Sequence, residues 1–300
     1  MDATTDKAFY GSFEVFQDIE FCRLYAASGR SDVIVRDGLV FLAKKYPLIG
    51  GLNAFVGNPE IHGRFASWVG KIDATQYAFV KVITSERVEC WDDYCVSAPD
   101  LNSMFLDLRQ GEQRLFDAFK RGCRREIKSG ESSGVQIYPS ESARDLEDFY
   151  QILSKSSLEG GLFDIFSFEQ YEKLLATKYS VLFVARRNGI ALGGAFFLLS
   201  KNTMHGWHGA ILRNRPAEIP IGRVLYFHCM RWGVRHGYSY FDFGTQRVTE
   251  NKGIFDFKMS FNPVLKPAYV YNLPGCGYKR IINLLHKNVK ELALICKRKG

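Results

Sequence analysis

The amino-acid sequence predicts an α/β protein made of two similar halves. In each half a helical segment precedes two apolar strands joined by a tight turn, Asp37-Gly38 in the first half and Asn188-Gly189 in the second. These dipeptides favour the two-residue turns of β-hairpins, because both turn residues there adopt a positive φ. Helix and hairpin recur after about 140–150 residues, which indicates an internal duplication with layered helices and strands in each half.

The first half is predicted to contain an early helix at 15–28, followed mainly by strands. Its strand segments are rich in β-branched and aromatic residues, which favour extended chain, and residues 60–73 are predicted as helical or irregular. The predicted strands are 32–35, 39–44, 77–83, 88–96 and 104–107.

The second half repeats this order with longer elements. Apolar residues at helical spacing predict helices at 143–156, 167–177 and 221–236. Apolar or alternating runs predict strands at 181–186, 190–199, 203–211, 240–243, 256–261 and 268–271.

Residues 111–129 lie between the halves and have the period of one long helix. At about 100° per residue, Leu115, Phe119 and Cys123 fall on one side, and six lysines and arginines fall on the other. We therefore expect a first domain at 1–110, a basic inter-domain helix at 111–134, and a second domain at 135–300 that ends in a basic helix.

The positive charge of the chain is concentrated in two short stretches. The 300 residues carry a net charge of +8, with 46% hydrophobic residues, which excludes a disordered chain. Residues 114–128 hold six Lys and Arg against two acids, and residues 278–300 hold seven against one. Such patches suit phosphates, nucleic acid or an anionic membrane surface, although two solvated helix faces would have the same composition.

The sequence predicts a cytoplasmic protein without a membrane span. The N-terminus lacks the basic and apolar regions of a secretory signal, and the longest apolar run, 189–199, is far shorter than a bilayer-spanning helix. Seven cysteines form an odd set without a Cys-x-x-Cys pair, so we expect buried free thiols rather than disulfides or zinc ligands.

Several residues are candidates for chemistry on a phosphate-bearing substrate. Lys258 lies in a mostly apolar segment, where burial is costly unless an anion meets it; the alternative is that it faces solvent. A proline-bearing loop enters a predicted helix at Gly222, whose free N–H groups, with Arg223, could bind phosphate or carboxylate; a plain loop-to-helix entry is the alternative. No metal site is predicted, because His205 and His208 would point to opposite faces of a strand.

These residues stand in segments that resemble the FemABX-like family, whose members carry two GNAT-type acyltransferase domains in tandem. The first segment runs Phe105-Leu-Asp107-Leu108-Arg-Gln-Gly111, with Arg124-x-x-Ile127-Lys128 after it. The second runs Tyr240-Phe-Asp242-Phe-Gly244, then Gly253-Ile-Phe255-x-Phe257-Lys258-x-x-Phe261. The resemblance covers roughly residues 13–275, and it implies two GNAT-like domains, each with a mixed, mainly antiparallel sheet flanked by helices.

The resemblance also implies a function, namely transfer of an amino acid or acyl group to an amine of a cell-envelope precursor, as in peptidoglycan synthesis. Lys258 matches the family lysine associated with the donor phosphates, and Arg124 and Lys128 match basic positions of the inter-domain helix. Arg223 and Tyr226 match the helix that faces the acceptor more loosely. The implied co-substrate is aminoacyl-tRNA or an acyl-CoA, with no other cofactor.

The residues that would bind and react can be named only in part. We expect Lys258 to neutralise donor phosphate or developing charge, and Arg223 with the N–H of Gly222 to hold an acceptor phosphate. Asp242, His208 and Tyr226 are candidate bases, and a substrate phosphate could take the proton instead.

Three functions are consistent with this sequence. The first is aminoacyl transfer from tRNA to a phosphate-bearing envelope precursor, with peripheral membrane contact through residues 278–300. The second is acyl-CoA-dependent transfer to a sugar or small amine, although Arg213-Asn-Arg-Pro-Ala-Glu differs from the usual loop for that donor. The third is a non-catalytic protein that binds RNA or polysaccharide.

Overall fold

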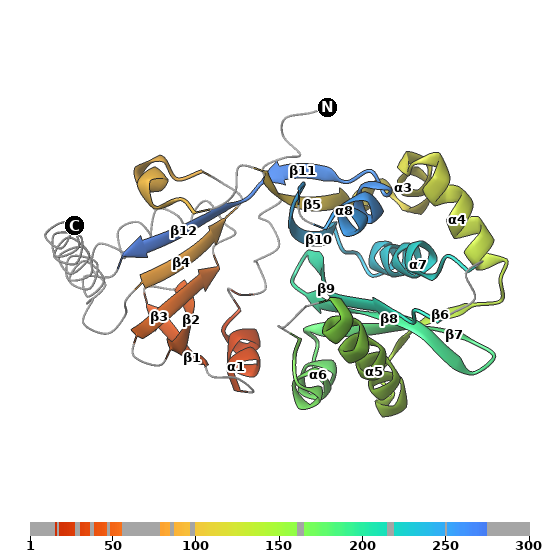
Figure 1. Cartoon of the computed structure of the whole chain (residues 1–300), viewed down its shortest axis with the longest axis horizontal. Coiled ribbons are helices and arrows are strands. Elements are labelled where there is room, and N and C mark those ends of the chain that lie inside the picture. Colours follow the sequence, from red (N-terminus) through yellow and green to blue (C-terminus); the bar gives the residue numbers. More distant parts are fainter. Residues whose placement is uncertain are drawn as a thin grey trace, which may run out of the picture. The chain divides into compact units, whose positions relative to one another are not determined.

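The computed structural model describes residues 16, 18–27, 31–36, 39–46, 49–55, 79–84, 87–96, 100–160, 165–214, 219–249 and 251–274. The chain forms two compact units (Figure 1). One unit contains Ala98–Ala268, and the other contains Phe16–Ser97 together with the chain from Tyr269 onward. The predicted C-terminal basic helix at 278–300 lies outside the described residues.

The Phe16–Ser97 unit is built on a five-stranded sheet in the order β1-β2-β3-β4-β12. The pair β3 and β4 is parallel, and the other neighbours are antiparallel. The elements are α1 (Ile19–Ala27), β1 (Ser31–Arg36), β2 (Leu39–Tyr46), β3 (Ile49–Phe55), β4 (Phe79–Thr84), the 3-10 helix η3 (Glu89–Tyr94) and β12 (Tyr269–Pro274).

The Ala98–Ala268 unit is built on a seven-stranded sheet in the order β11-β5-β10-β9-β8-β7-β6. Here β9 and β10 are the parallel pair, and all other neighbours are antiparallel. Its strands are β5 (Leu101–Asp107), β6 (Gln136–Ser140), β7 (Ser180–Arg187), β8 (Ile190–Leu199), β9 (Thr203–Ile211), β10 (Tyr240–Arg247) and β11 (Val264–Pro267). Its helices are the 3-10 helix η4 (Leu108–Gln110), α3 (Glu112–Ala118), α4 (Arg121–Glu131), α5 (Ala143–Gly160), α6 (Phe168–Leu175), α7 (Ile221–Arg235) and α8 (Lys252–Met259).

The predicted fold class is confirmed, and the two sheets share one strand order. Strands β1-β2-β3-β4-β12 and β7-β8-β9-β10-β5 have the same sequence of pairings: two antiparallel, one parallel, one antiparallel. The last strand of each series comes from a distant part of the chain. This agrees with the internal duplication expected from the two hairpins.

The domain limits differ from the predicted ranges 1–110, 111–134 and 135–300 because each sheet takes one strand from beyond its own half. Strand β5 was assigned to the first half, but it pairs with β10 and belongs to the Ala98–Ala268 unit. Strand β12 was assigned to the second half, but it pairs with β4. Local periodicity does not reveal which sheet a strand joins, since that choice depends on long-range backbone hydrogen bonds.

Strand β8 is an interior strand of the larger sheet, and helices cover both of its faces. Neighbouring residues of a strand point to opposite faces. Phe196 contacts Tyr171 of α6, with ring centroids 4.9 Å apart, and Phe197 contacts Tyr226 of α7 at 6.0 Å. Both phenylalanines have no exposed surface. The apolar run at 189–199 is therefore a central strand, and none of the described helices is long and apolar enough to cross a membrane.

The predicted inter-domain helix is in fact two helices. Phe119 adopts an extended conformation and Lys120 is not helical, so α3 ends and α4 begins within 111–129. The guanidinium of Arg124 donates to the carbonyl oxygens of Asp117 and Phe119 at 2.6 and 2.7 Å, which satisfies acceptors at the end of α3. Helical periodicity continues across this break, so the sequence does not reveal it.

Two other predicted strands are helical. Residues 88–96 contain η3, and residues 256–261 contain most of the last turn of α8. Lys258 is therefore a helical residue. Short apolar segments fit both a strand and a buried helix, and tertiary packing selects between them. The described cysteines Cys22, Cys123 and Cys229 are buried free thiols, whereas Cys95 is exposed.

A charged cluster holds α5 onto the β7–β8 hairpin. The guanidinium of Arg186 donates to Asp145 at 2.5 and 2.8 Å, to Asp148, and to the carbonyl of Gly189 at 2.9 Å. Ser140 of β6 donates to the other oxygen of Asp145 at 2.5 Å. Arg186 and Asp145 are both buried, so their charges are stabilised mainly by each other.

We predict that Arg186→Met lowers the free energy of unfolding by about 3 kcal/mol, since removing one partner of a buried pair leaves the other charge unpaired. Urea denaturation would measure the loss. The neighbouring Arg187→Met is the control, because Arg187 is only partly buried, and it should stay within about 0.5 kcal/mol of wild type. Equal losses in the two variants would contradict the role given to this cluster.

Candidate functional site

Strands β9 and β10 are parallel for only three residue pairs and then diverge. Thr203–His205 pair with Tyr240–Asp242, after which β9 continues to Ile211 without pairing to β10. Strand β10 has an irregular register between Asp242 and Thr245. Gly244 in this segment has a φ of +80°, a conformation that favours glycine. The divergence leaves backbone edges of both strands free of each other, next to the start of α7.

The N-terminus of α7 packs closely against the end of β9. A Cβ on Gly222 would lie 2.9 Å from Cδ1 of Ile211 and 3.2 Å from Phe257 of α8, so a side chain here would force its neighbours apart. Pro220 precedes the helix, and no side chain caps the first turn. The Ile221 amide donates to the carbonyl oxygen of Ile219 at 2.9 Å, and anion binding by the Gly222 amide stays a prediction from the sequence.

Tyr226 places a phenol next to the diverging part of β9. Its ring stacks on Phe243 of β10 at 6.0 Å and meets Phe257 of α8 edge-on at 5.2 Å. A Cβ on Gly209, an exposed residue of β9, would lie 2.9 Å from the Tyr226 hydroxyl oxygen. Burial raises the pKa of Tyr226 well above its ordinary value, so the phenol stays protonated and can donate a proton.

Lys258 follows Phe257 on α8 and is partly buried. Burial lowers the pKa of its ammonium to about 8, and the charge of Asp242 opposes this shift. Asp242 is the one charged group of the described residues that affects this pKa, and the two do not form an ion pair. Burial thus disfavours the charged form of Lys258, and an incoming anion would stabilise that form.

Asp242 is completely buried, so in this structure no substrate atom can contact its carboxylate. One oxygen accepts a hydrogen bond from the Gly244 amide at 2.8 Å, and the other lies 3.2 Å from Nδ1 of His205. The sequence indicates Asp242 as a candidate base, whereas its burial and hydrogen bonds indicate a structural role in β10.

Arg223 is engaged by protein groups. Its guanidinium donates to Glu126 of α4 at 2.6 Å and to the Ser260 hydroxyl at 3.2 Å, and it lies 5.8 Å from the Phe257 ring centre. The arginine therefore connects α4, α7 and α8. An acceptor phosphate at Arg223, as expected from the sequence, would have to compete with Glu126.

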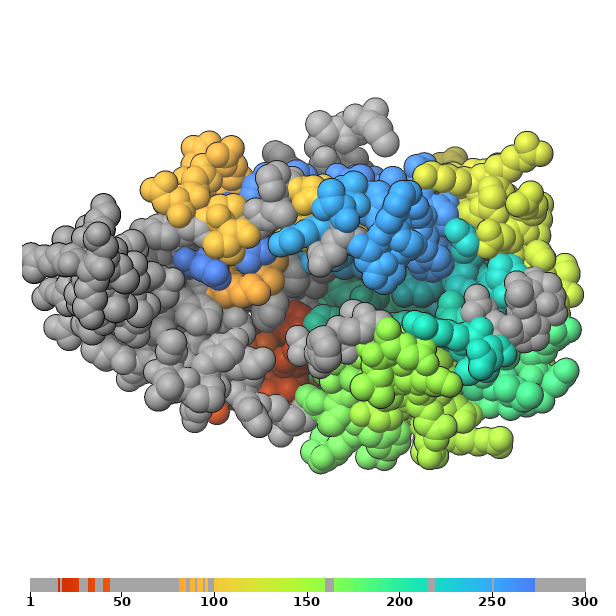
Figure 2. All heavy atoms as spheres, in the orientation of Figure 1, coloured from red at the N-terminus to blue at the C-terminus, as the bar shows by residue number. Residues whose placement is uncertain are grey.

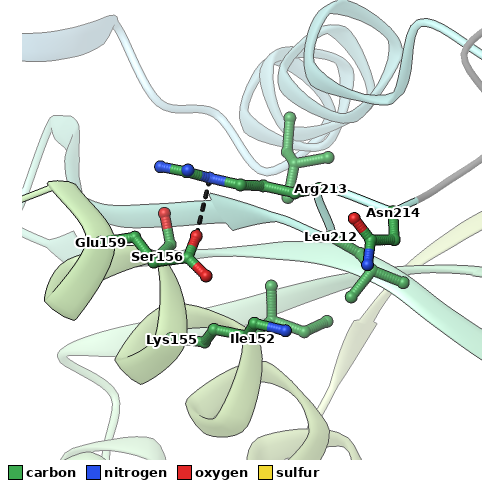
Figure 3. A pocket seen from close by; sticks show the side chains of 8 residues that line it. Ile152, Lys155, Ser156, Glu159, Leu212, Arg213 and Asn214 are labelled. Atoms are coloured by element: carbon green, nitrogen blue, oxygen red, sulfur yellow. Dashed lines mark ion pairs between the residues drawn. The ribbon is translucent and has the colours of Figure 1, made fainter.

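A cavity of about 300 Å³ lies where α5 approaches the end of β9 (Figure 3). Ile152, Lys155, Ser156 and Glu159 of α5 line one side. The other side is formed by residues 211–214, whose Arg213 makes an ion pair with Glu159 at 3.0 Å. Ile211, which lines this cavity, also lies beside Gly222 at the start of α7.

Three of the residues predicted from the sequence lie apart from this arrangement. Arg124 caps α3. Lys128 is exposed on α4, with its ammonium 5.9 Å from the Phe116 ring centre. His208 faces α6, where Nδ1 lies 2.5 Å from the Tyr171 hydroxyl. The structure thus groups Tyr226, Gly222, Arg223, Lys258 and Asp242 and leaves these three elsewhere.

The expectation that His205 and His208 face opposite sides is wrong. The register of β9 against β8 shifts between them: His205 lies opposite Leu198, and His208 lies opposite Phe196. Residues 196 and 198 share a face, so both histidines share it too. The described residues still contain no group of three potential metal ligands.

Sequence reasoning did not select several residues at the site. Lys155, Ser156 and Glu159 stand on one side of α5 at helical spacing, but polar residues on a surface helix give no specific signal. His205 was considered only as a metal ligand, and its pairing with Asp242 depends on the register of β9 and β10. Gly209 becomes informative only when Tyr226 is placed above it.

Comparison with known proteins supports an acyltransferase fold. Residues 117–259 match the family described as the acetyltransferase (GNAT) domain. No curated protein matches the chain.

Among solved structures, the chain is similar to FemX, with a TM-score of 0.71, 13% identity, and coverage of 93% of this chain and 96% of that one. It is also similar to the C-terminal domain of a putative lysylphosphatidylglycerol synthetase from Agrobacterium fabrum, with a TM-score of 0.61, 14% identity, and coverage of 85% and 87%. A tandem GNAT protein from the clavulanic acid biosynthesis pathway gives a TM-score of 0.51, 10% identity, and coverage of 84% and 86%. The protein therefore has the FemABX-like tandem GNAT fold, and the match of residues 117–259 to the acetyltransferase (GNAT) domain supports a transferase.

Proposed function

We propose that the protein transfers an aminoacyl group from aminoacyl-tRNA to an amine of a phosphate-bearing envelope precursor of the peptidoglycan type. The observation that carries this proposal is the group formed by Tyr226 and Lys258 beside the diverging strands β9 and β10. The fold shared with FemX, and with a lysylphosphatidylglycerol synthetase domain whose name refers to a phosphate-bearing lipid, supports the same direction.

In the proposed reaction the acceptor amine attacks the ester carbonyl of the donor. The new C–N bond forms as the C–O bond to the tRNA ribose breaks, and the ribose oxygen takes a proton. The neutral Tyr226 phenol is suited to supply that proton, and the Lys258 ammonium to stabilise the oxyanion or a donor phosphate. The proton of the attacking amine passes to a substrate phosphate and then to solvent, and solvent returns a proton to the Tyr226 phenolate.

A basic surface on α3 and α4 supports a phosphate-rich donor. Three of the four acids on these helices face α7: Glu112 and Glu131 bind Arg231, and Glu126 binds Arg223. Five cations remain exposed without an ion pair to any described residue, and the segment protrudes in yellow in Figure 2. This basic surface consists of Arg114, Lys120, Arg121, Arg125 and Lys128.

An acyl-CoA donor is the second candidate, because the matched family is described as an acetyltransferase domain. The same divergence of strands would admit a thioester, whose sulfur would then be the leaving group. A direct comparison of donors distinguishes the two.

We predict that purified protein incubated with an amine acceptor forms an amide from aminoacyl-tRNA and not from acetyl-CoA, as followed by mass spectrometry. Lys258→Ala should lower the turnover at least about tenfold, which corresponds to about 1.4 kcal/mol of barrier. Lys252→Ala on the exposed start of the same helix is the control and should retain wild-type turnover. Turnover of Lys258→Ala within about threefold of wild type would refute the assigned role, and binding without any transfer would favour a non-catalytic protein.

We predict that tRNA affinity falls with rising salt, and that Arg121→Ser with Arg125→Ser reduces the slope of log affinity against log salt by about one to two. When a phosphate contact is lost, fewer counterions are released on binding, so the affinity depends less steeply on salt. Arg187→Ser removes a positive charge elsewhere and should leave the slope unchanged. Filter binding over a salt series measures it, and a slope that does not respond to the double substitution would exclude this surface as the RNA site.

We predict that Lys258 makes the free energy of unfolding depend on pH above neutrality. Its pKa is about 8 in the folded protein against an ordinary 10.5, so between these values the unfolded chain binds more protons. The contribution of Lys258 to stability therefore rises as the pH increases from about 8 to about 10.5. In urea denaturation, the free energy of unfolding of wild type relative to Lys258→Met should be higher at about pH 10 than at about pH 7. A difference that is the same at both pH values would contradict the lowered pKa.

A further inference from the structure

The parallel strands β9 and β10 end their pairing at a buried carboxylate and a buried imidazole. Asp242 and His205 are the last matched residues of the two strands, with exposed fractions of 0% and 3%. The Asp242 carboxylate and His205 Nδ1 are 3.2 Å apart. Neither residue can meet a substrate, so any effect on the reaction must pass through neighbouring groups.

The chemistry of the pair fixes the direction of its hydrogen bond. An ionised carboxylate only accepts, so Nδ1 of His205 must carry the hydrogen and donate it. The other ring nitrogen, Nε2, lies 3.3 Å from the hydroxyl oxygen of Ser200, which also contacts the Thr203 backbone in the β8–β9 turn. With the hydrogen on Nδ1, Nε2 accepts from the Ser200 hydroxyl, whose oxygen accepts from the Thr203 amide at 3.2 Å, so the imidazole is held at both ends.

Asp242, held by His205, in turn affects two features of the site, the Gly244 segment and Lys258. Its second oxygen accepts from the Gly244 amide at 2.8 Å, in the segment where β10 turns away from β9. Its charge also acts on Lys258 of α8. A buried carboxylate is costly unless it accepts hydrogen bonds, and His205 is the described side chain that lies within hydrogen-bond distance of it.

We infer that His205 is a positioning residue for acyl transfer: it holds the Asp242 carboxylate in its orientation, and thereby sets the Gly244 turn and the electrostatic environment of Lys258. The link to turnover rests on the proposed function. The link to Gly244 and Lys258 is a property of the protein without substrate.

Two matched amides separate this role from simple packing. In His205→Asn the amide nitrogen takes the position of Nδ1 and keeps the donor to Asp242, whereas in His205→Gln the donor is displaced by one bond. Amide hydrogen exchange at Gly244 should be at least about tenfold faster in His205→Gln and close to wild type in His205→Asn. Ser140→Ala, which also loses a buried hydrogen bond but lies in the Asp145 cluster, should not change exchange at Gly244.

A second measurement follows the charge of Lys258 directly. NMR of ¹³C-methylated lysines, with Lys258→Arg used to assign the signal, gives the titration midpoint. Asp242 is the only described charge that acts on Lys258, so the midpoint should fall by about half a unit or more in His205→Gln and in Asp242→Asn. In His205→Asn it should stay at the wild-type value.

With an active donor, His205→Gln should reduce kcat at least about tenfold with KM within about threefold, and His205→Asn should restore it. Gly244 exchange and a Lys258 midpoint that are identical in all variants would overturn the inference. Absence of transfer by wild type from either donor would overturn the proposed function alone, because the exchange and titration measurements use no substrate.

Discussion

The hydrogen bond from the Gly244 amide to the Asp242 carboxylate marks the point at which two parallel strands stop pairing. Parallel strands in a sheet normally continue side by side, because each unpaired backbone group that is buried costs free energy. Here a buried side chain accepts one of those amides, and a glycine with positive φ lies where the register of β10 against β5 shifts. The strands separate at the site because the Gly244 amide donates to the Asp242 carboxylate instead of to a backbone carbonyl of β9.

The other sheet shows what happens without that exchange. Strands β3 and β4 are the corresponding parallel pair, and they remain in register for five residue pairs. Both sheets accept a distant antiparallel strand beside their parallel pair, β12 in one and β5 in the other. The duplicated topology therefore provides the framework twice, and among the described strands only β9 and β10 carry the irregularity that separates them.

The glutamates of α3 and α4 face α7, whereas their exposed lysines and arginines face solvent. The glutamates of α3 and α4 bind arginines of α7, which fastens these helices together over the buried apolar core. The lysines and arginines that remain are exposed. The charged side chains of α3 and α4 therefore form two sets: the glutamates hold the helices together, and the exposed lysines and arginines can bind an anionic partner. Lys258 differs from both, because its partial burial makes its charge sensitive to an incoming anion.

The sequence by itself determined the α/β class, the two hairpins and most of the second-half elements, since these depend on local periodicity and turn residues. It also indicated Lys258, Tyr226 and Gly222, whose residue types are unusual in their segments. Only the tertiary structure decided that β5 and β12 join distant sheets, that 111–129 breaks at Phe119, and that 256–261 is helical. The partners of Arg223 and Asp242 also depend on the tertiary structure, because hydrogen bonds between residues 37 and 97 positions apart have no local trace in the sequence.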